Sequence, residues 1–327
     1  MDRRTTLTLA GAALVSPAAA FAGADGAAPA FVRPDRALMV PVPGGRAYVR
    51  INGDLAAPPP PLVMIHGGPG GTHGGFLPAL PLAEDRAVIL YDQLDCGMSD
   101  KPGDPANWVV PRFVAELEAI REALGIARWH VLGHSWGGTV ALEYAARRPE
   151  GLESLVLQGP LISTPAWMAD AATLRARLPQ DVQATLDACE GPTPPGKAQC
   201  DAAVDAFYAR FWRLRPPSAW AVAYEKAHDL KLAANLYNAM WGPNEFRATG
   251  SLRDYDGQPL LKRIAAPTLF LIGDSDEVTE ETARRFADET PGARLRIIAD
   301  AAHRAQSDQP QAYIAALGAW LREHDRP

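Results

Sequence analysis

Residues 129–138 read Trp-His-Val-Leu-Gly-His-Ser-Trp-Gly-Gly, an apolar run followed by a G-x-S-x-G pentapeptide. The run 129–132 predicts a buried strand, and residues 136–147 predict a helix. A serine between a strand and a helix is typical of a nucleophile elbow, whose tight turn exposes the hydroxyl above the edge of a sheet. The pattern therefore predicts that Ser135 is a catalytic nucleophile.

Five further apolar runs resemble the run that precedes this serine. They occur at residues 62–65, 87–91, 155–157, 268–272 and 295–298. Runs without polar alternation suit strands that are covered on both faces, as in a parallel sheet. Helical patterns lie between them, and Phe113, Leu117 and Ile120 share one face of such a helix. This alternation predicts an α/β fold with a mostly parallel, doubly wound sheet.

The chain before these runs predicts a β-hairpin. Residues 37–42 and 46–51 flank the turn signal Pro43-Gly44-Gly45. Pro41 has no backbone N–H to donate, so we expect its strand to lie at an edge of the sheet.

The alternation of strand and helix patterns is interrupted between residues 164 and 245. This stretch has no strand pattern and is rich in Ala, Leu, Trp and Tyr, with several prolines. We expect it to form a helical cap inserted into a catalytic core made of residues 31–163 and 246–327. An insertion at this point would cover the carboxyl edge of the sheet, where open α/β sheets bind ligands.

Residues 1–22 have the layout of a signal peptide. Arg3 and Arg4 precede an apolar stretch that ends at Ala20-Phe21-Ala22, a small-residue cleavage pattern. The arginine pair resembles a twin-arginine signal. The apolar stretch is short for a bilayer span. We therefore expect a periplasmic or secreted mature protein that is not attached to a membrane.

The composition narrows the classes of function. With 47% hydrophobic and 21% charged residues among 327, the chain is not a disordered protein. A net charge of −6 without a basic run argues against a nucleic-acid partner. No His or Cys cluster has zinc spacing, and we expect no metal or organic cofactor. After export, Cys189 and Cys200 are close enough in sequence to close a small disulfide loop, whereas Cys96 is expected to be structural.

A nucleophilic serine needs a histidine base and a carboxylate that orients this base. In folds with this elbow, the carboxylate and then the histidine follow the serine along the chain. His303 follows the run 295–298 and is the expected base. The candidate carboxylates are Asp274, Asp276, Glu277 and Asp300. Asp276 is far enough past its strand to turn back toward the histidine, whereas Asp274 could instead fix the turn through an Asx-type bond.

An oxyanion hole needs two backbone N–H groups. Trp136, the residue after the nucleophile, is expected to supply one of them. The other should come from the glycine-dense loop His66-Gly67-Gly68-Pro69-Gly70-Gly71, which follows the run 62–65. Gly68 is the expected donor, because glycine lets the backbone approach a substrate closely.

Four segments together resemble the prolyl aminopeptidases, or proline iminopeptidases, of the α/β-hydrolase fold. They are His66-Gly67-Gly68-Pro69-Gly70, Tyr91-Asp92-Gln93, Gly133-His134-Ser135-Trp136-Gly137-Gly138 and Gly242-Pro243-Asn244-Glu245-Phe246. The resemblance covers residues 35–323 and is loosest in the cap. It implies the α/β-hydrolase fold and the release of an N-terminal residue, often proline, by a serine nucleophile under a helical cap.

The resemblance also implies roles for individual residues. The segment 273–278 matches the family's G-x-x-D-x-V pattern at its catalytic aspartate, which favours Asp276. Two glutamates of these enzymes hold the free α-ammonium of the substrate, and the matching residues are Glu245 and Glu277. Carboxylates compensate for the cost of moving a cation into a partly dry pocket. The loop after Asp92-Gln93 departs from the family pattern, with Asp95 in place of a glycine and Met98 in place of an arginine. We expect this loop to lie near the site and to affect substrate preference.

The sequence thus predicts an exported serine aminopeptidase that acts on small peptides or amino-acid amides through an acyl-enzyme. It would release proline or another small or apolar residue. The nearest alternative is an esterase, amidase or lactonase with the same triad, which would have no use for paired glutamates. The complete Ser, Asp and His set argues against a noncatalytic binding protein. Ser135 also excludes the aspartate nucleophile of haloalkane dehalogenases and epoxide hydrolases.

Overall fold

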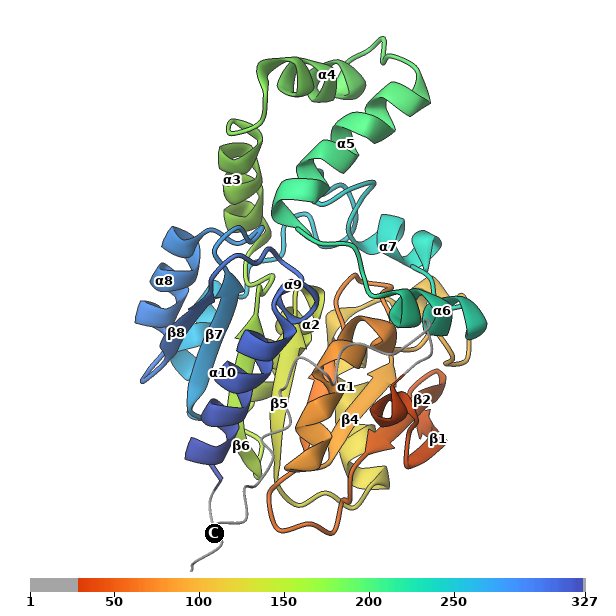
Figure 1. The fold of residues 1–327 in the computed structure, drawn as a ribbon, viewed down its shortest axis with the longest axis vertical. Coiled ribbons are helices and arrows are strands. Elements are labelled where there is room, and N and C mark those ends of the chain that lie inside the picture. The colour runs from red at the N-terminus through yellow and green to blue at the C-terminus, as the bar shows by residue number, and fades with distance from the viewer. Residues whose placement is uncertain (1–28, 326–327) are drawn as a thin grey trace, which may run out of the picture.

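A single sheet of eight strands organises the computed structural model, which describes residues 29–325. The proposed signal segment 1–22 lies outside these residues. The strands are β1 (Arg36–Val42), β2 (Gly45–Asn52), β3 (Leu62–Ile65), β4 (Val88–Asp92), β5 (Trp129–His134), β6 (Leu152–Gln158), β7 (Thr268–Gly273) and β8 (Arg294–Ile298). They lie in the order β1-β2-β4-β3-β5-β6-β7-β8 (Figure 1). The strands from β4 to β8 in this order pair in parallel, so the predicted α/β fold is confirmed.

The predicted hairpin forms the antiparallel edge of this sheet. β1 pairs with β2 from Val42 opposite Gly45 to Arg36 opposite Ile51. β2 then pairs antiparallel with β4. Pro41 lies in the edge strand β1, where its missing N–H costs no bond of a central strand.

Helices cover both faces of the sheet, which explains why the strand sequences do not alternate. On one face lie α1 (Val110–Ala123), α2 (Trp136–Ala145) and α8 (Glu280–Glu289), and on the other η4 (His73–Glu84) and α10 (Pro310–Glu323). Val63 and Ile65 of β3 belong to the first apolar core, and Leu62 and Met64 belong to the second. Among residues 29–325, no helix is both long and apolar enough to cross a bilayer.

The 3-10 helix η4 has no counterpart in the sequence analysis. It contains Pro78 and Pro81, which lack the backbone donor that a regular α-helix would use. Its apolar side chains nevertheless pack in the second core, where Phe76, Leu77 and Leu80 are buried. Burial of these side chains, and not local helix preference, therefore keeps this segment ordered.

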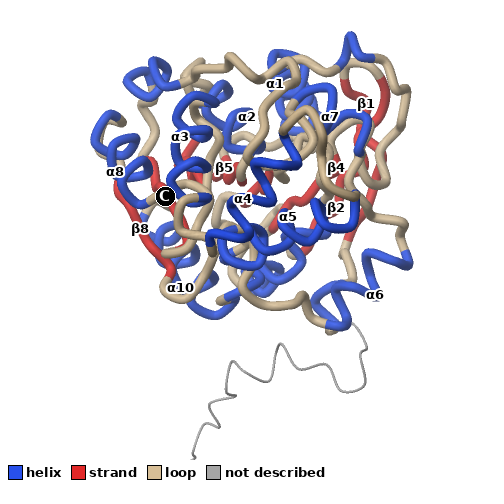
Figure 2. Tube along the Cα trace, turned by 90° about the horizontal axis from the view of Figure 1, so that it is seen from above, coloured by secondary structure: helices blue, strands red, loops and turns tan. Residues whose placement is uncertain are grey.

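Five helices follow β6 without an intervening strand (Figure 1). They are α3 (Thr164–Arg175), α4 (Gln180–Glu190), α5 (Lys197–Phe211), α6 (Ala219–Ala227) and α7 (Ala234–Met240). Seen from above, α4 and α5 lie over the sheet (Figure 2). The first three helices enclose an apolar cluster of their own that includes Phe207 and also Phe246. In contrast, α6 and α7 pack on the sheet cores through Trp220 and Tyr237.

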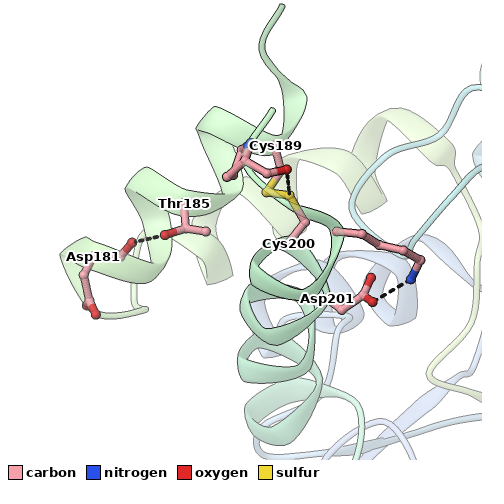
Figure 3. Close-up of a disulfide and its surroundings, with 7 residues drawn as sticks. Asp181, Thr185, Cys189, Cys200 and Asp201 are labelled. Carbon is pink, nitrogen blue, oxygen red and sulfur yellow. Dashed lines mark hydrogen bonds and ion pairs between the residues drawn. A yellow bond between two sulfur atoms is a disulfide. The ribbon is translucent and has the colours of Figure 1, made fainter. Parts of the chain in front are cut away.

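A disulfide fastens the outer end of this helical region. Cys189, near the end of α4, is bonded to Cys200 in the first turns of α5 (Figure 3). The bond closes the Pro-rich loop between these two helices, across a sequence separation of 11 residues. Cys96 is free and buried in the first apolar core.

Candidate active site

Ser135 lies at the sharp turn between β5 and α2. Its φ of 55° and ψ of −122° are values that residues other than glycine rarely adopt. A Cβ on Gly133 would lie 2.1 Å from the carbonyl oxygen of Gly137, and a Cβ on Gly137 would lie 2.2 Å from that of Ile65. The two glycines are therefore required by the close passage of strand and helix. The turn presents Ser135 at the carboxyl edge of the sheet, as the pentapeptide predicts.

The same edge brings together Asp276 and His303 from the loops after β7 and β8. The Nδ1 atom of His303 lies 2.7 Å from Oδ1 of Asp276, and both side chains are buried. Asp276 also accepts hydrogen bonds from the backbone N–H groups of Gly273 and Val278, each at 3.2 Å. These bonds fix the carboxylate, which in turn orients the imidazole. His303 is further anchored because its backbone N–H donates to the carbonyl of Phe211 at the end of α5.

Ser135 and His303 line one cavity of about 650 Å³ beneath α5, α6 and α7. Among the hydrogen bonds of residues 29–325, none joins the Ser135 hydroxyl to His303. The Nε2 atom of His303 instead faces Oε2 of Glu277 at 3.7 Å. Catalytic hydrogen bonds are commonly long without a substrate and shorten in the complex. The arrangement thus holds a serine, an imidazole and a carboxylate in the order that a triad requires.

Two N–H groups at this edge are available for an oxyanion. Within the described residues, the backbone N–H groups of Gly68 and Trp136 donate to no other group. Gln93 connects the two loops that carry them. Its amide nitrogen donates to the carbonyl of His66 at 3.0 Å, and its oxygen accepts from the Trp136 indole at 2.9 Å. Gln93 therefore joins the glycine-rich loop to the start of α2, a contact that its place in the Tyr91-Asp92-Gln93 motif did not predict.

The structure distinguishes among the four candidate carboxylates. Asp276 contacts His303, whereas Asp274 accepts hydrogen bonds from the N–H groups of Asp300 at 2.7 Å and Ala301 at 3.3 Å. The suggestion that Asp274 closes an Asx-type turn of its own is therefore wrong, because it holds the loop that leads to the histidine. Asp300 lies at the surface and pairs with Arg215.

Glu245 and Glu277 lie close to each other on one side of His303. The hydroxyl of Tyr237 donates to Oε1 of Glu245 at 2.7 Å, and the backbone N–H of Glu245 lies 3.3 Å from the hydroxyl of Tyr208. Both carboxylate oxygens of Glu277 are buried and have no hydrogen-bond partner among residues 29–325. Neither glutamate pairs with a lysine or arginine of that range. The negative charge of the two carboxyl groups is therefore free to be compensated by a bound cation.

The environment shifts the pKa of each of these groups. Burial raises the pKa of Glu245, although the hydrogen bond from Tyr237 and the nearby His303 oppose this shift. Burial also raises the pKa of Glu277 well above its usual value, and the negative charges of Glu245 and Asp276 add to the effect. For His134, burial lowers the pKa well below the usual value, and the charge of His303 acts in the same direction. His134 is thus a neutral neighbour of the site, with its ring 4.5 Å from that of His303.

The loop after Asp92-Gln93 does not reach the cavity at its two unusual positions. Asp95 accepts hydrogen bonds from the N–H of Gly103 at 2.7 Å and from the Trp108 indole at 2.8 Å. Met98 is partly exposed, and neither side chain lines the cavity. The expectation that this loop lies near the site is therefore wrong for Asp95 and Met98. The Asp95 side chain stabilises the loop itself, and the Met98 side chain is exposed to solvent.

Several side chains that line the cavity were missed by the sequence analysis. They are Tyr208, Trp212, Tyr237 and Arg304. Three of them belong to the helical insertion, whose sequence carries no fixed pattern, and the only available signal was its richness in Tyr and Trp. Among residues 29–325, no group of three or more His, Cys, Asp or Glu side chains is placed to hold a metal ion.

A family model and many known proteins are similar to this chain. The model, described as alpha/beta hydrolase fold, matches residues 60–310. A proline iminopeptidase of Heyndrickxia coagulans is 38% identical over 262 residues, which cover 80% of this chain and 90% of that protein. The crystal structure of VinJ is 34% identical with a TM-score of 0.82, and the match covers 89% of this chain and 100% of VinJ. The crystal structure of the Mycobacterium smegmatis proline iminopeptidase, also 34% identical, gives a TM-score of 0.78 and covers 89% of this chain and 99% of that one.

Proposed function

Because the chain belongs to the proline iminopeptidase family of α/β hydrolases, we propose that it is a serine aminopeptidase. Its substrates are short peptides or amino-acid amides with a free N-terminal amine. The residue released is proline or another small or apolar one. The proposal needs a nucleophile, a site for the ammonium and space for a leaving group, and each is supported by a different part of the cavity.

The proposed reaction proceeds through an acyl-enzyme. The oxygen of Ser135 attacks the scissile carbonyl while His303 takes the hydroxyl proton, and Asp276 stabilises the imidazolium that forms. The N–H groups of Gly68 and Trp136 bind the oxyanion of the tetrahedral intermediate. His303 then gives its proton to the departing amine as the C–N bond breaks. Water attacks the ester with His303 again as base, and this step releases the N-terminal residue and regenerates the serine.

The pair of glutamates beside His303 is the observation that carries the aminopeptidase proposal. Glu277 is 2% exposed and its carboxylate oxygens have no hydrogen-bond partner within residues 29–325. Leaving a buried acid in this state costs free energy, and a substrate ammonium between the two carboxyl groups would recover part of it. An esterase for neutral acyl groups gains nothing from this arrangement.

A panel of paired substrates tests the proposal. Aminoacyl p-nitroanilides with a free amine are expected to be cleaved with a kcat/KM at least roughly 30-fold higher than their N-acetylated forms, because acetylation removes the charge and adds bulk. Simple esters such as p-nitrophenyl acetate serve as the comparison without an amine. Equal rates on acetylated and free-amine substrates would instead identify a general esterase or amidase.

We also propose that the protein is exported through the segment 1–22. The twin-arginine pair and the Ala20-Phe21-Ala22 pattern support this, and the disulfide between Cys189 and Cys200 suits an oxidising compartment. Intact-mass analysis of the protein from the periplasm is expected to find a chain that begins at Gly23, lacks the two thiol hydrogens of the disulfide and keeps Cys96 free. Replacing Arg3 and Arg4 by lysine should block export. An uncleaved chain that stays in the cytoplasm with three free thiols would contradict the proposal.

A further inference from the structure

One cationic side chain in the wall of the cavity, that of Arg304, has no role in the proposed chemistry. Arg304 lines the cavity directly after His303 in sequence. Its Nε atom is buried and has no hydrogen-bond partner among residues 29–325. Its guanidinium lies 5.2 Å from the centre of the Trp212 ring, and no carboxylate of the described chain lies within ion-pair distance of it. Arg304 is thus held by packing, with its hydrogen-bonding capacity unused.

The surroundings of Arg304 are different from those of the two glutamates. Its Nη2 atom lies 3.0 Å from the position of a Cβ on Gly75 in η4, and its backbone N–H donates to the carbonyl of Trp212. Burial lowers the pKa of Arg304; the charge of Arg213 acts in the same direction, whereas those of Glu225 and Asp308 oppose it. Glu245, in contrast, contacts Tyr237 of α7 and Tyr208 of α5. The wall of the cavity therefore holds Glu245 and Arg304 together with Ser135 and His303, and Glu277 lies 3.7 Å from Nε2 of His303.

The charge and shape of the Arg304 guanidinium suit one kind of ligand group. A guanidinium in a half-buried site gains most from a planar anion that accepts two of its N–H groups, and a carboxylate is such an anion. Glu225 also lines the cavity but makes no ion pair with Arg304. A peptide whose ammonium lies at the glutamates directs its remaining residues away from them, and a short one ends in a carboxylate inside the same cavity.

We propose that Arg304 binds the free α-carboxylate of the leaving group and so determines a preference for dipeptides and tripeptides. This inference rests on the proposed aminopeptidase function. A peptide chain spans about 3.3–3.6 Å per residue, so a peptide anchored at both ends within one cavity of about 650 Å³ is short. An acidic side chain on the leaving residue offers the same carboxylate chemistry, and the test separates the two sources.

The experiment compares three substrates that share the same scissile bond type. They are Pro-Ala as the free acid, Pro-Ala amide, and Pro-Glu amide, which has a side-chain carboxylate but no α-carboxylate. For the unmodified enzyme, kcat/KM on Pro-Ala is expected to exceed that on Pro-Ala amide by roughly tenfold or more, as for a hydrogen bond to a charged group. In Arg304→Gln this ratio is expected to fall close to one, mainly through KM, because the contact exists in the ground state as well.

Comparing substrates on one preparation makes the ratio independent of the folded fraction, so a destabilised Arg304→Gln variant remains informative. Arg304→Lys keeps the charge without the planar fork and should retain part of the preference. Arg213→Gln is the matched control. Arg213 also lies over the Trp212 ring, at 4.9 Å, but does not line the cavity, and its removal should leave the ratio nearly unchanged.

Three outcomes would overturn the proposal. The first is equal cleavage of Pro-Ala and Pro-Ala amide by the unmodified enzyme, and the second is a ratio that survives Arg304→Gln. The third is an Arg304-dependent preference for Pro-Glu amide without one for Pro-Ala, which would assign the arginine to side-chain recognition. All three leave the aminopeptidase function intact, since the peptides are still cleaved. Failure to cleave any of the peptides, with hydrolysis of simple esters, would instead overturn both the proposed function and this inference.

Discussion

Replacing Ser135 by alanine is expected to lower kcat by roughly 10³-fold or more, and His303→Ala should cost about as much. The two residues act as a unit, because the hydroxyl is a weak nucleophile without the base and the base has no proton to take without the hydroxyl. The double variant should therefore be little worse than either single variant. Steady-state kinetics on an aminoacyl p-nitroanilide measures these losses, and far-UV circular dichroism checks that the variants are folded.

Labelling by a serine-directed phosphonate provides the second measurement for the same assignment. Peptide mapping is expected to find the label on Ser135 of the unmodified enzyme and none on Ser135→Ala. Ser99, in the loop after β4, is a matched control, because it is also buried but its hydroxyl donates to the carbonyl of Asp92. Labelling that persists in Ser135→Ala would remove this serine from the mechanism.

Replacing Glu245 or Glu277 by glutamine is expected to lower kcat/KM for free-amine substrates by roughly 30-fold or more. Truncating one partner of a buried charge pair typically costs about 2–5 kcal/mol, and each 1.4 kcal/mol is about tenfold. Glutamine keeps the size of the side chain, so the change removes charge without opening a cavity. The loss should be far smaller for p-nitrophenyl acetate, which has no ammonium, and comparing the two substrates on each variant measures the difference.

Glu225→Gln is the matched control for these two variants. Glu225 lines the same cavity but comes from α6 and lies beside Gly74 of η4. We expect its removal to change kcat/KM for free-amine substrates by less than about threefold, a change of well under 1 kcal/mol. An effect as large as that of Glu277→Gln would move the ammonium site to another part of the cavity.

The pH profile gives the glutamate assignment a second signature. Burial raises the pKa of both carboxyl groups, so they lose their negative charge at a higher pH than exposed glutamates as the solution is acidified. The kcat/KM for free-amine substrates should therefore fall on the acid side at a higher pH in the unmodified enzyme than the same profile for p-nitrophenyl acetate. Identical profiles for the two substrates would contradict a role for these carboxylates.

The elbow and the sheet could be predicted because their signals are local. The strand, the turn at Ser135 and the following helix lie within residues 129–147, and their glycines are required by contacts inside that segment or with the adjacent β3. The loops of Asp276 and His303 were located by a general property of parallel sheets, whose strands all end at the same edge. Local preference could not predict η4, because its prolines disfavour an α-helix and only burial in the second core orders it.

The sequence by itself determined the α/β fold, the strand–turn–helix that presents Ser135, and the order in which the serine, the carboxylate and the histidine follow one another. The family pattern favoured Asp276 over Asp274, but only the tertiary structure showed which of the two contacts His303, since these carboxylates are two residues apart and differ in which loop their oxygens face. Only the tertiary structure placed Arg304 and Trp212 in the wall of the cavity. Their positions follow from packing between the helical insertion and the loop of His303, where the carbonyls of Phe211 and Trp212 accept bonds from residues about ninety positions away. Such contacts have no periodicity along the chain, because they depend on how separate segments meet in space and not on the conformational preference of either segment.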